Sequence, residues 1–333
     1  MTIEAYAPGR VNLIGEHTDY TGGLVLPMAV QMGITITGEA VGERVVLESD
    51  LDDEPAIIEL DVDDPAGVEP AWARYVAGVV AEARPEHGFI GQVRSTLPMG
   101  MGLSSSAALE VAVALAIGVR GTAPEVATLC QRAEQRASGV PCGVMDQLTS
   151  LAGVEGHAAL IDCTNLTVTP VELPERAEVV VVDSGEPRTL AGSGYADRRA
   201  ECEAAQAVIG PLAQASLDDL EALDDPVLRR RAHHVITENG RVLAFVNALG
   251  AGDLAEAGRL MAASHASLRD DFEVSTPGLD EMVAGLVTKK GVYGARLTGG
   301  GFGGSLVVLA APGALRHGTT VVPSGGARVR TLR

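Results

Sequence analysis

A loop rich in glycine and serine leads directly into an apolar helix between Leu97 and Leu115, where the sequence reads LPMGMGLSSSAALEVAVAL. A helix that is apolar on nearly every side has to be buried. Its first N–H groups have no partner within the helix, and they carry the positive end of the helix dipole. The pattern therefore predicts a buried helix whose start can receive an anion such as phosphate.

The residue types of this loop suit such a role. Gly100 and Gly102 have no Cβ atom that would hold a phosphate away from the backbone, and hydroxyl groups follow at Ser104, Ser105 and Ser106. The loop is not a Walker A sequence, because the chain's two lysines lie far away, and it lacks the third glycine of the dinucleotide-binding fingerprint. From this stretch alone, a phosphate loop and an ordinary serine N-cap on a core helix are equally good interpretations.

The charge balance restricts the partners of the chain. It has 25 basic and 44 acidic residues and a net charge of −19, so nucleic acids and anionic membranes are poor partners. A site for an anion such as ATP must then supply its own positive potential. The N-terminal sequence has no apolar signal core, no apolar run approaches the ~20 residues of a membrane span, and the four cysteines form no C-x-x-C pair. We therefore expect a cytoplasmic protein with reduced thiols.

The order of the predicted elements indicates an α+β protein. Runs typical of strands lie at 24–30, 33–40, 44–49, 56–62, 157–163, 166–174, 177–185 and 292–311. Helices are expected after the three serines, from the capping box TAPE with Thr122 as N-cap and Glu125 reaching back, and between 195 and 286. We divide the chain into two domains, 1–172 and 173–333.

Two further stretches concentrate glycine with polar residues. APGRVNLIGEHTDYTGG, at 7–23, holds Arg10, Glu16, His17 and Asp19, and LTGGGFGG ends at Gly304. Carboxylates accept hydrogen bonds from the hydroxyls of a polyhydroxylated ligand, and an arginine holds a permanent charge near phosphate. Taken singly, however, the two stretches are more typical of a polar loop and a tight strand connection.

Together, the three stretches resemble the three motifs of the GHMP kinase superfamily, and in detail those of the galactokinases. GRVNLIGEHTDYTGG is similar to the sugar-binding signature, LPMGMGLSSSAALE to the phosphate loop and GARLTGGGFGGS to the third motif, and the resemblance extends through 133–151 and 193–205. It implies the two-domain GHMP kinase fold with the active site in the cleft between the domains. It also implies transfer of the γ-phosphoryl group of ATP to the C1 hydroxyl of galactose, giving galactose 1-phosphate in the first step of galactose utilisation.

The resemblance assigns the catalytic roles to Asp146 and Arg10. The carboxylate of Asp146 is expected against the anomeric hydroxyl, as base or electrostatic anchor, although from the residues alone Asp146 would be the N-cap of the helix that follows. Arg10 is expected beside Asp146 and the transferring phosphoryl group. There it favours the ionised carboxylate and stabilises charge on the phosphoryl oxygens.

ATP and Mg²⁺ are the other partners that the resemblance implies. The residues expected to bind ATP are Gly100, Met101, Gly102, Leu103, Ser104, Ser105 and Ser106. Mg²⁺ is expected on Ser106 and Glu134, since this hard cation takes oxygen ligands. Glu134 borders an apolar helix stripe and so can project into a cleft; the alternative is a surface carboxylate beside Arg132 or Arg136.

The sugar-binding set is also carried over from the resemblance. Its members are Glu16, His17, Thr18, Asp19, Gly143 and Tyr195. Asp183 matches the family pattern as well, and we expect only a structural role for it. The chain departs from the pattern at Thr21, where asparagine is usual, and in a shortened passage after GGGFGG.

Two alternatives to a galactose kinase stay open. One is a GHMP kinase for another sugar, such as N-acetylgalactosamine or arabinose. The other is a non-catalytic sensor of galactose and ATP, but such sensors lose the Ser-Ala pair that is intact here as Ser106 and Ala107. We expect a monomer that binds neither nucleic acid nor membranes.

Overall fold

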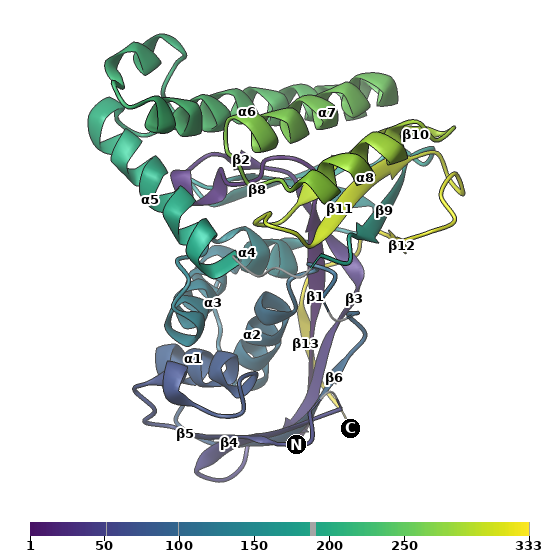
Figure 1. Ribbon diagram of the computed structural model, residues 1–333. Coiled ribbons are helices and arrows are strands. Elements are labelled where there is room, and N and C mark those ends of the chain that lie inside the picture. The colour runs from purple at the N-terminus through teal and green to yellow at the C-terminus, as the bar shows by residue number, and fades with distance from the viewer. Residues whose placement is uncertain (51, 99, 187–190, 333) are drawn as a thin grey trace.

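The computed structural model describes residues 1–50, 52–98, 100–186 and 191–332 (Figure 1). Met99 of the glycine–serine loop and Arg333 at the end of the predicted second domain lie outside the described residues. Within the described ranges, the strands form sheets of six, four and three strands.

The six-stranded sheet has the order β13-β1-β3-β6-β4-β5, and its neighbours are antiparallel except β4 and β6. Its strands are β1 (Thr2–Asn12), β3 (Pro27–Glu39), β4 (Arg44–Ser49), β5 (Ala56–Glu59), β6 (Phe89–Ser95) and β13 (Arg328–Thr331). The sequence pattern does not predict β1. Its second half is buried on both faces and therefore has no alternation of apolar and polar residues.

Helices cover one face of this sheet (Figure 1). They are α1 (Ala73–Ala83), α2 (Ser105–Ala116), α3 (Ala123–Ser138) and α4 (Met145–Ala152). The prediction that α2 is buried is confirmed, and α3 begins with the predicted capping box of Thr122 and Glu125. The interpretation of Asp146 as an N-cap is wrong, because the N-cap of α4 is Val144 and Asp146 lies within the first helical turn.

The second half is built on the four-stranded sheet β10-β11-β9-β12. Its strands are β9 (Glu178–Asp183), β10 (Val292–Thr298), β11 (Ser305–Ala310) and β12 (Thr319–Val321), and its helices are α5 (Ala191–Ile209), α6 (Pro226–Ala251), α7 (Leu254–Asp270) and α8 (Pro277–Val287). Helices α7 and α8 pack on β10 (Figure 1). Since α5 begins at Ala191, Tyr195 lies within its second turn and does not open the helix.

A small sheet of β2 (Leu24–Val25), β7 (His157–Asp162) and β8 (Thr167–Glu172) stands between the two halves, and short 3-10 turns lie at Asp19–Thr21, Pro65–Gly67 and Asp218–Ala222. The chain then returns to its start, because β13 pairs with β1 beside the N-terminus (Figure 1). We keep the division near residue 172 as a proposal, with β13 as a strand of the second segment that completes the sheet of the first.

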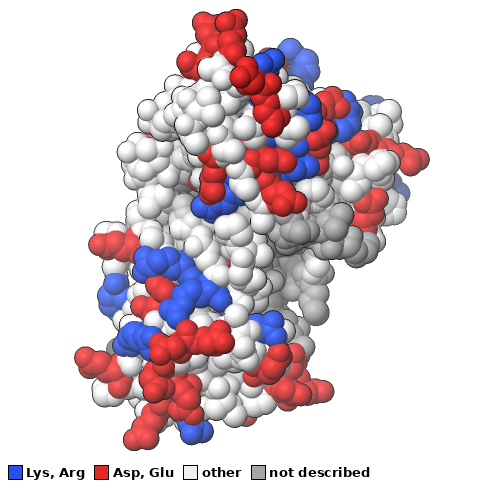
Figure 2. Space-filling view, turned by 60° about the vertical axis from the view of Figure 1, so that its left-hand side comes forward, with Lys and Arg blue, Asp and Glu red and all other residues white. Residues whose placement is uncertain are grey.

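Charged side chains of both signs are mixed on the face shown in Figure 2, where basic groups gather over its lower half beside acidic ones. Arg132 and Arg136 of α3 both pair with Glu82 of α1, and Arg84, directly after α1, pairs with Asp63. These arginines are therefore balanced by carboxylates. Separately, none of the helices in the described ranges combines the length and the apolar character needed to cross a bilayer.

Candidate active site

A cleft of ≈ 710 Å³ lies between the two halves. The predicted site residues that line it are Arg10, Glu16, His17, Asp19, Gly100, Gly102, Leu103, Ser104, Ser105, Ser106, Glu134, Gly143, Asp146 and Tyr195. The second half adds Asp183, Glu186 and the glycines of the third motif. Asp183, for which we expected only a structural role, is exposed on this wall. The fold-class prediction, an α+β GHMP kinase fold with a cleft between its halves, is confirmed.

An irregularity in β1 brings Arg10 to the cleft. The register with β3 shifts between Pro8 and Arg10, at Gly9. A Cβ atom on Gly9 would lie 2.5 Å from the carbonyl oxygen of Leu103, so glycine permits the strand to touch the glycine–serine loop. The backbone N–H of Arg10 donates to that same carbonyl over 3.1 Å. Arg10 therefore lies on a strand braced by the glycine–serine loop, whereas residues 13–23 form the expected polar loop between β1 and β2.

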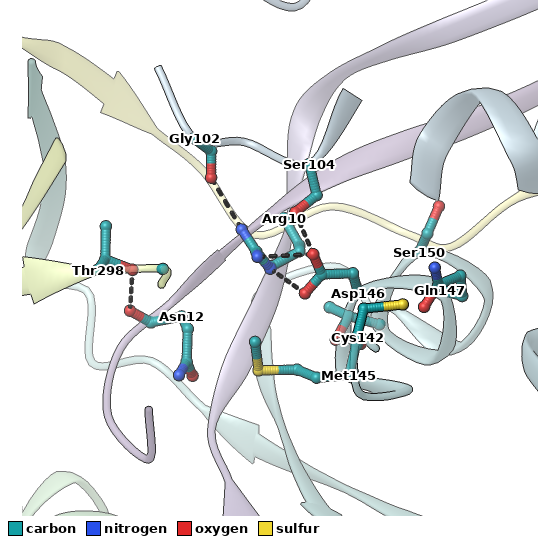
Figure 3. A network of polar contacts seen from close by, with 12 residues as sticks. Arg10, Asn12, Gly102, Ser104, Cys142, Met145, Asp146, Gln147, Ser150 and Thr298 are labelled. Carbon is teal, nitrogen blue, oxygen red and sulfur yellow. Dashed lines mark hydrogen bonds and ion pairs between the residues drawn. The ribbon is translucent and has the colours of Figure 1, made fainter. Parts of the chain in front are cut away.

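Arg10 and Asp146 form a two-pronged ion pair (Figure 3). Nε of Arg10 lies 2.6 Å from Oδ1 of Asp146, and its second terminal nitrogen lies 2.7 Å from Oδ2. The remaining guanidinium nitrogen of Arg10 donates to the carbonyl of Gly102 over 2.8 Å. The hydroxyl of Ser104 donates to Asp146. Burial of Arg10 works against its charge, but the carboxylates of Asp146 and Glu16 outweigh it and raise the pKa of the guanidinium. A charged pair is thus fixed at the mouth of α2.

The glycine–serine loop has the backbone that its composition requires. Gly100 and Gly102 have φ of +79° and +68°, and Ser104 follows at +53°. Ser104 makes no side-chain cap bond to α2, because its hydroxyl bonds to Asp146, so the ordinary N-cap interpretation is wrong. The carbonyl of Met101 accepts from the hydroxyl of Ser305 over 3.0 Å, which ties the loop to β11. Met101 thus contributes backbone and does not line the cleft in the described part of the chain.

Glu134 faces the cleft from α3. The hydroxyl of Ser106 donates to its Oε1 over 2.8 Å, and the amide of Gln147 donates to its Oε2 over 2.6 Å. The surface alternative is wrong, because Arg132 and Arg136 turn away to Glu82. Burial, reinforced by the charge of Asp146, raises the pKa of Glu134. Its described hydrogen-bond partners, Ser106, Cys142 and Gln147, are all neutral, so no positive group of the protein offsets the cost of burying this carboxyl group.

The residues at this wall fit Mg²⁺. Among the described residues, no group of three or more His, Cys, Asp or Glu is placed to hold a metal, so a dense cage is not formed. One hydroxyl and one carboxylate, at Ser106 and Glu134, are nevertheless side by side. Mg²⁺ bound to a nucleotide takes its remaining ligands from phosphate and water, so two protein oxygens suffice. A bound cation would supply the positive partner that Glu134 lacks among the described residues.

Asp19 and Gly143 form one corner of the cleft. A Cβ atom on Gly143 would lie 1.8 Å from Oδ2 of Asp19, so the carboxylate rests directly on the glycine backbone. Burial, and then the neighbouring charges of Asp146 and Glu16, raise the pKa of Asp19 to about 7. The corner presents a carboxyl group whose charge changes near neutral pH.

His17 and Glu16 connect the first motif to the third. The hydroxyl of Tyr20 lies 3.0 Å from Nδ1 of His17, and the carbonyl of Gly300 lies 3.2 Å from Nε2. A carbonyl only accepts, so Nε2 carries the proton, and burial lowers the pKa of His17 to about 3. Glu16 accepts from the N–H of Gly299 over 2.9 Å. Both residues line the cleft while bracing it.

Thr18 and Thr21 stabilise the turn within the first motif. The hydroxyl of Thr18 donates to the carbonyl of Leu24 over 2.7 Å, and Thr18 is buried and not among the described cleft-lining residues. The hydroxyl of Thr21 donates to the carbonyl of Thr18 over 2.9 Å. The threonine that replaces the usual asparagine is thus accommodated inside the turn.

Helix α6 holds this motif from behind, and the sequence reasoning missed it. His234 contacts the carbonyl of Glu16 over 3.1 Å, Glu238 accepts from the N–H of Gly15 over 3.0 Å, and Asn239 accepts from the N–H of Leu24 over 2.8 Å. His234 and Glu238, at positions i and i+4, share one helix face, and Asn239 is the next residue round the helix. Polar residues within the otherwise apolar buried part of α6 are the sequence signal that could have indicated this supporting role.

Comparisons with known proteins agree with this geometry. Residues 3–39 match the family model described as the galactokinase galactose-binding signature, residues 73–154 match the GHMP kinases N terminal domain, and residues 245–316 match the GHMP kinases C terminal. The chain is 44% identical to the galactokinase of Homo sapiens, over 93% of this chain and 85% of that protein. It is 46% identical to the galactokinase of Roseiflexus sp. (strain RS-1), over 91% of this chain and 82% of that protein.

A solved structure gives the same result. The galactokinase of Lactococcus lactis, crystallised in complex with galactose, superimposes with a TM-score of 0.87 at 31% identity, over 98% of this chain and 95% of that one. Mevalonate kinases, at 20% identity or less, share the fold alone. With identity above 30% across nearly its whole length, the chain is an enzyme of the galactokinase family, built on the GHMP kinase fold.

Proposed function

We propose that this enzyme transfers the γ-phosphoryl group of ATP to the C1 hydroxyl of galactose, and that Asp146 and Arg10 are its catalytic residues. The observation that carries the proposal is the buried two-pronged pair of Arg10 and Asp146 at the amino-terminal end of α2. A carboxylate that orients a hydroxyl and a guanidinium that faces phosphate are what phosphoryl transfer requires.

The proposed reaction has one chemical step. The C1 oxygen of the sugar forms a bond to the γ-phosphorus, the bond from that phosphorus to the bridging oxygen breaks, and ADP leaves. Asp146 accepts the hydroxyl proton as the new bond forms. Arg10 orients Asp146 and stabilises the charge that spreads over the phosphoryl oxygens.

The nucleotide phosphates are proposed to lie on the glycine–serine loop. The N–H groups at the start of α2 and the hydroxyl of Ser105 offer donors there, beside Ser104 and Ser106, and left-handed Gly100 and Gly102 keep the backbone accessible. Ser106 and Glu134 would hold Mg²⁺, which when bound supplies positive charge to the phosphate oxygens. This arrangement explains how a chain of net charge −19 admits a polyanion.

The sugar is proposed to lie against Asp19, Gly143, Tyr195 and the adjoining edge of Glu16 and His17. Carboxylates there accept hydrogen bonds from sugar hydroxyls, and a site that pairs each hydroxyl rejects analogues that lack one. For Thr18 we propose a structural role. The Lactococcus lactis relative was crystallised with galactose, which supports galactose over N-acetylgalactosamine or arabinose. The monomeric state and cytoplasmic location stay predictions.

The test is an ADP-release assay of the purified chain across galactose, its 2-acetamido analogue, arabinose, mevalonate and homoserine, with ³¹P NMR of the product. We expect turnover with galactose and an anomeric phosphate signal. Release with another substrate and not with galactose would contradict the proposed specificity. Binding of both ligands without ADP would identify a sensor.

A further inference from the structure

A buried amide lies directly behind the metal-binding wall of the cleft. Gln147 follows Asp146 in the first turn of α4, is fully buried, and lies on the side of α4 away from Arg10 (Figure 3). Its Nε2 donates to Oε2 of Glu134 over 2.6 Å and to Oε2 of Glu110 over 3.0 Å. Helices α2, α3 and α4 each contribute one member of this group. Neither Gln147 nor Glu110 is among the described residues that line the cleft.

The direction of the amide follows from its neighbours. Carboxylates accept hydrogen bonds and an amide NH₂ group donates two, so this orientation satisfies both contacts. The reverse orientation would place the amide oxygen against two carboxylates. Oε1 of Gln147 and Oε1 of Glu110 have no described partner, so the two N–H bonds are the contacts that hold the group together. Glu110 thereby fixes the second N–H and with it the plane of the amide.

The consequence concerns the orientation of Glu134. Its Oε2 is held by Gln147, which leaves Oε1 beside the hydroxyl of Ser106, at the cleft. No arginine or lysine among the described residues bonds to Glu134, so neutral donors alone set its orientation. Partners behind a metal ligand that fix its direction commonly change metal affinity when they are lost.

We propose that Gln147 is a positioning residue that fixes the Glu134 carboxylate in the orientation required to bind the metal, with Glu110 as the buried acceptor that orients Gln147. The inference rests on the proposed function, because it assumes a metal at Ser106 and Glu134. Since Gln147 and Asp146 are consecutive on α4, one helical turn also sets the distance from the metal ligand to the catalytic carboxylate.

The experiment is a Mn²⁺ titration followed by EPR, with the full chain and a saturating non-hydrolysable ATP analogue, against a protein-free reference. Gln147→Met keeps the length of the side chain and removes both donors. We expect Mn²⁺ affinity to fall by roughly 10-fold or more. The Mg²⁺ concentration for half-maximal rate should rise in parallel, while kcat at saturating Mg²⁺ changes much less.

Thr149→Val is the matched control. Thr149 is buried on the same helix, and its hydroxyl donates to the carbonyl of Met145 within α4. Its loss should lower thermal stability without changing Mn²⁺ affinity. An equal loss of affinity in Thr149→Val would indicate general loosening of α4 and would overturn the positioning role.

A second pair of variants covers the case in which Gln147→Met does not fold. Glu110→Gln retains an oxygen that accepts from Gln147, and Glu110→Leu does not. We expect Mn²⁺ affinity close to that of the wild type in the first and clearly weaker in the second. Unchanged affinity in folded Gln147→Met or in Glu110→Leu would contradict this inference alone, whereas a wild type that does not bind Mn²⁺ with the nucleotide would contradict the proposed metal site.

Discussion

The carboxyl groups on the two sides of the first turn of α4 differ in the partners that bind them. On one side, Asp146 is held by Arg10 and Ser104, so a permanent positive charge of the protein balances it. On the other side, Glu134 and Glu110 receive only neutral donors among the described residues, and burial raises the pKa of both. The protein thus pairs Asp146, which must stay in place before substrate binds, with a positive charge of its own. It provides no positive partner for Glu134, the proposed ligand of the cation.

This difference separates the roles that substitutions should reveal. Substitution of Arg10 removes the positive partner of Asp146, which the folded state needs. Replacement of the Glu134 carboxyl group by an amide removes only a ligand of the metal. The following variants test that contrast, and the largest effect is expected at the reacting carboxylate.

Asp146→Asn should lower kcat by about 10²- to 10⁴-fold, because asparagine keeps the shape but cannot accept the hydroxyl proton. Steady-state kinetics with galactose and ATP measure the loss, and calorimetry should show that galactose still binds. If turnover stays near that of the wild type, Asp146 is not the base.

Arg10→Ala should lower the free energy of unfolding by about 3 kcal/mol, since it leaves a carboxylate in the cleft without its partner. Urea denaturation followed by circular dichroism measures the change. Arg10→Lys should recover only part of it, because an ammonium group cannot form both bonds to Asp146. Full recovery by lysine would mean that charge alone, and not the two-pronged geometry, matters here.

Glu134→Gln should behave in the opposite way. It replaces a buried carboxyl group that has no cationic partner in the described structure, so thermal stability without metal should not fall. Metal affinity should weaken by roughly 10- to 100-fold. Differential scanning calorimetry with and without Mn²⁺ and nucleotide separates the two effects. A metal-free loss of stability as large as that of Arg10→Ala would remove the contrast between the two sides.

The smallest effect is expected from Asp19, whose pKa is raised to about 7. A carboxyl group whose folded pKa exceeds its unfolded value stabilises the fold when protonated, so its contribution is lost as pH rises from about 4 toward 7. Galactose affinity should rise over pH 6 to 8, because the ionised carboxylate is the better acceptor. Binding calorimetry checks this, and Asp19→Asn should flatten both pH profiles. An unchanged profile would assign the titration to another group.

Much of the site could be predicted from the sequence because local patterns carry it. From backbone physics alone, a glycine–serine loop before an apolar helix indicates an anion site or an ordinary N-cap equally well, and the apolar stripe beside Glu134 only permits this carboxylate to face inward. The resemblance then joined these segments to Arg10 and Asp146. Strand β1 escaped prediction because burial on both faces removes its alternation.

The long-range supports could not be predicted. His234, Glu238 and Asn239 contact residues of the first motif that lie more than two hundred positions earlier in the chain. The sequence of α6 contains no pattern that identifies those partners. The bridging role of Gln147 depends on three helices meeting, and helix patterns do not specify how helices meet. Such contacts come from the packed fold, which only the structure provides.

The most direct measurement is a crystal structure with Mn²⁺, a non-hydrolysable ATP analogue and galactose, with the metal located by its anomalous signal. We predict the metal on Ser106 Oγ and Glu134, the phosphates along Gly100–Ser106, and the sugar C1 hydroxyl against Asp146. A metal bound instead by Asp146 or Asp19, with Glu134 free of it, would contradict the division of charge between the two sides of α4.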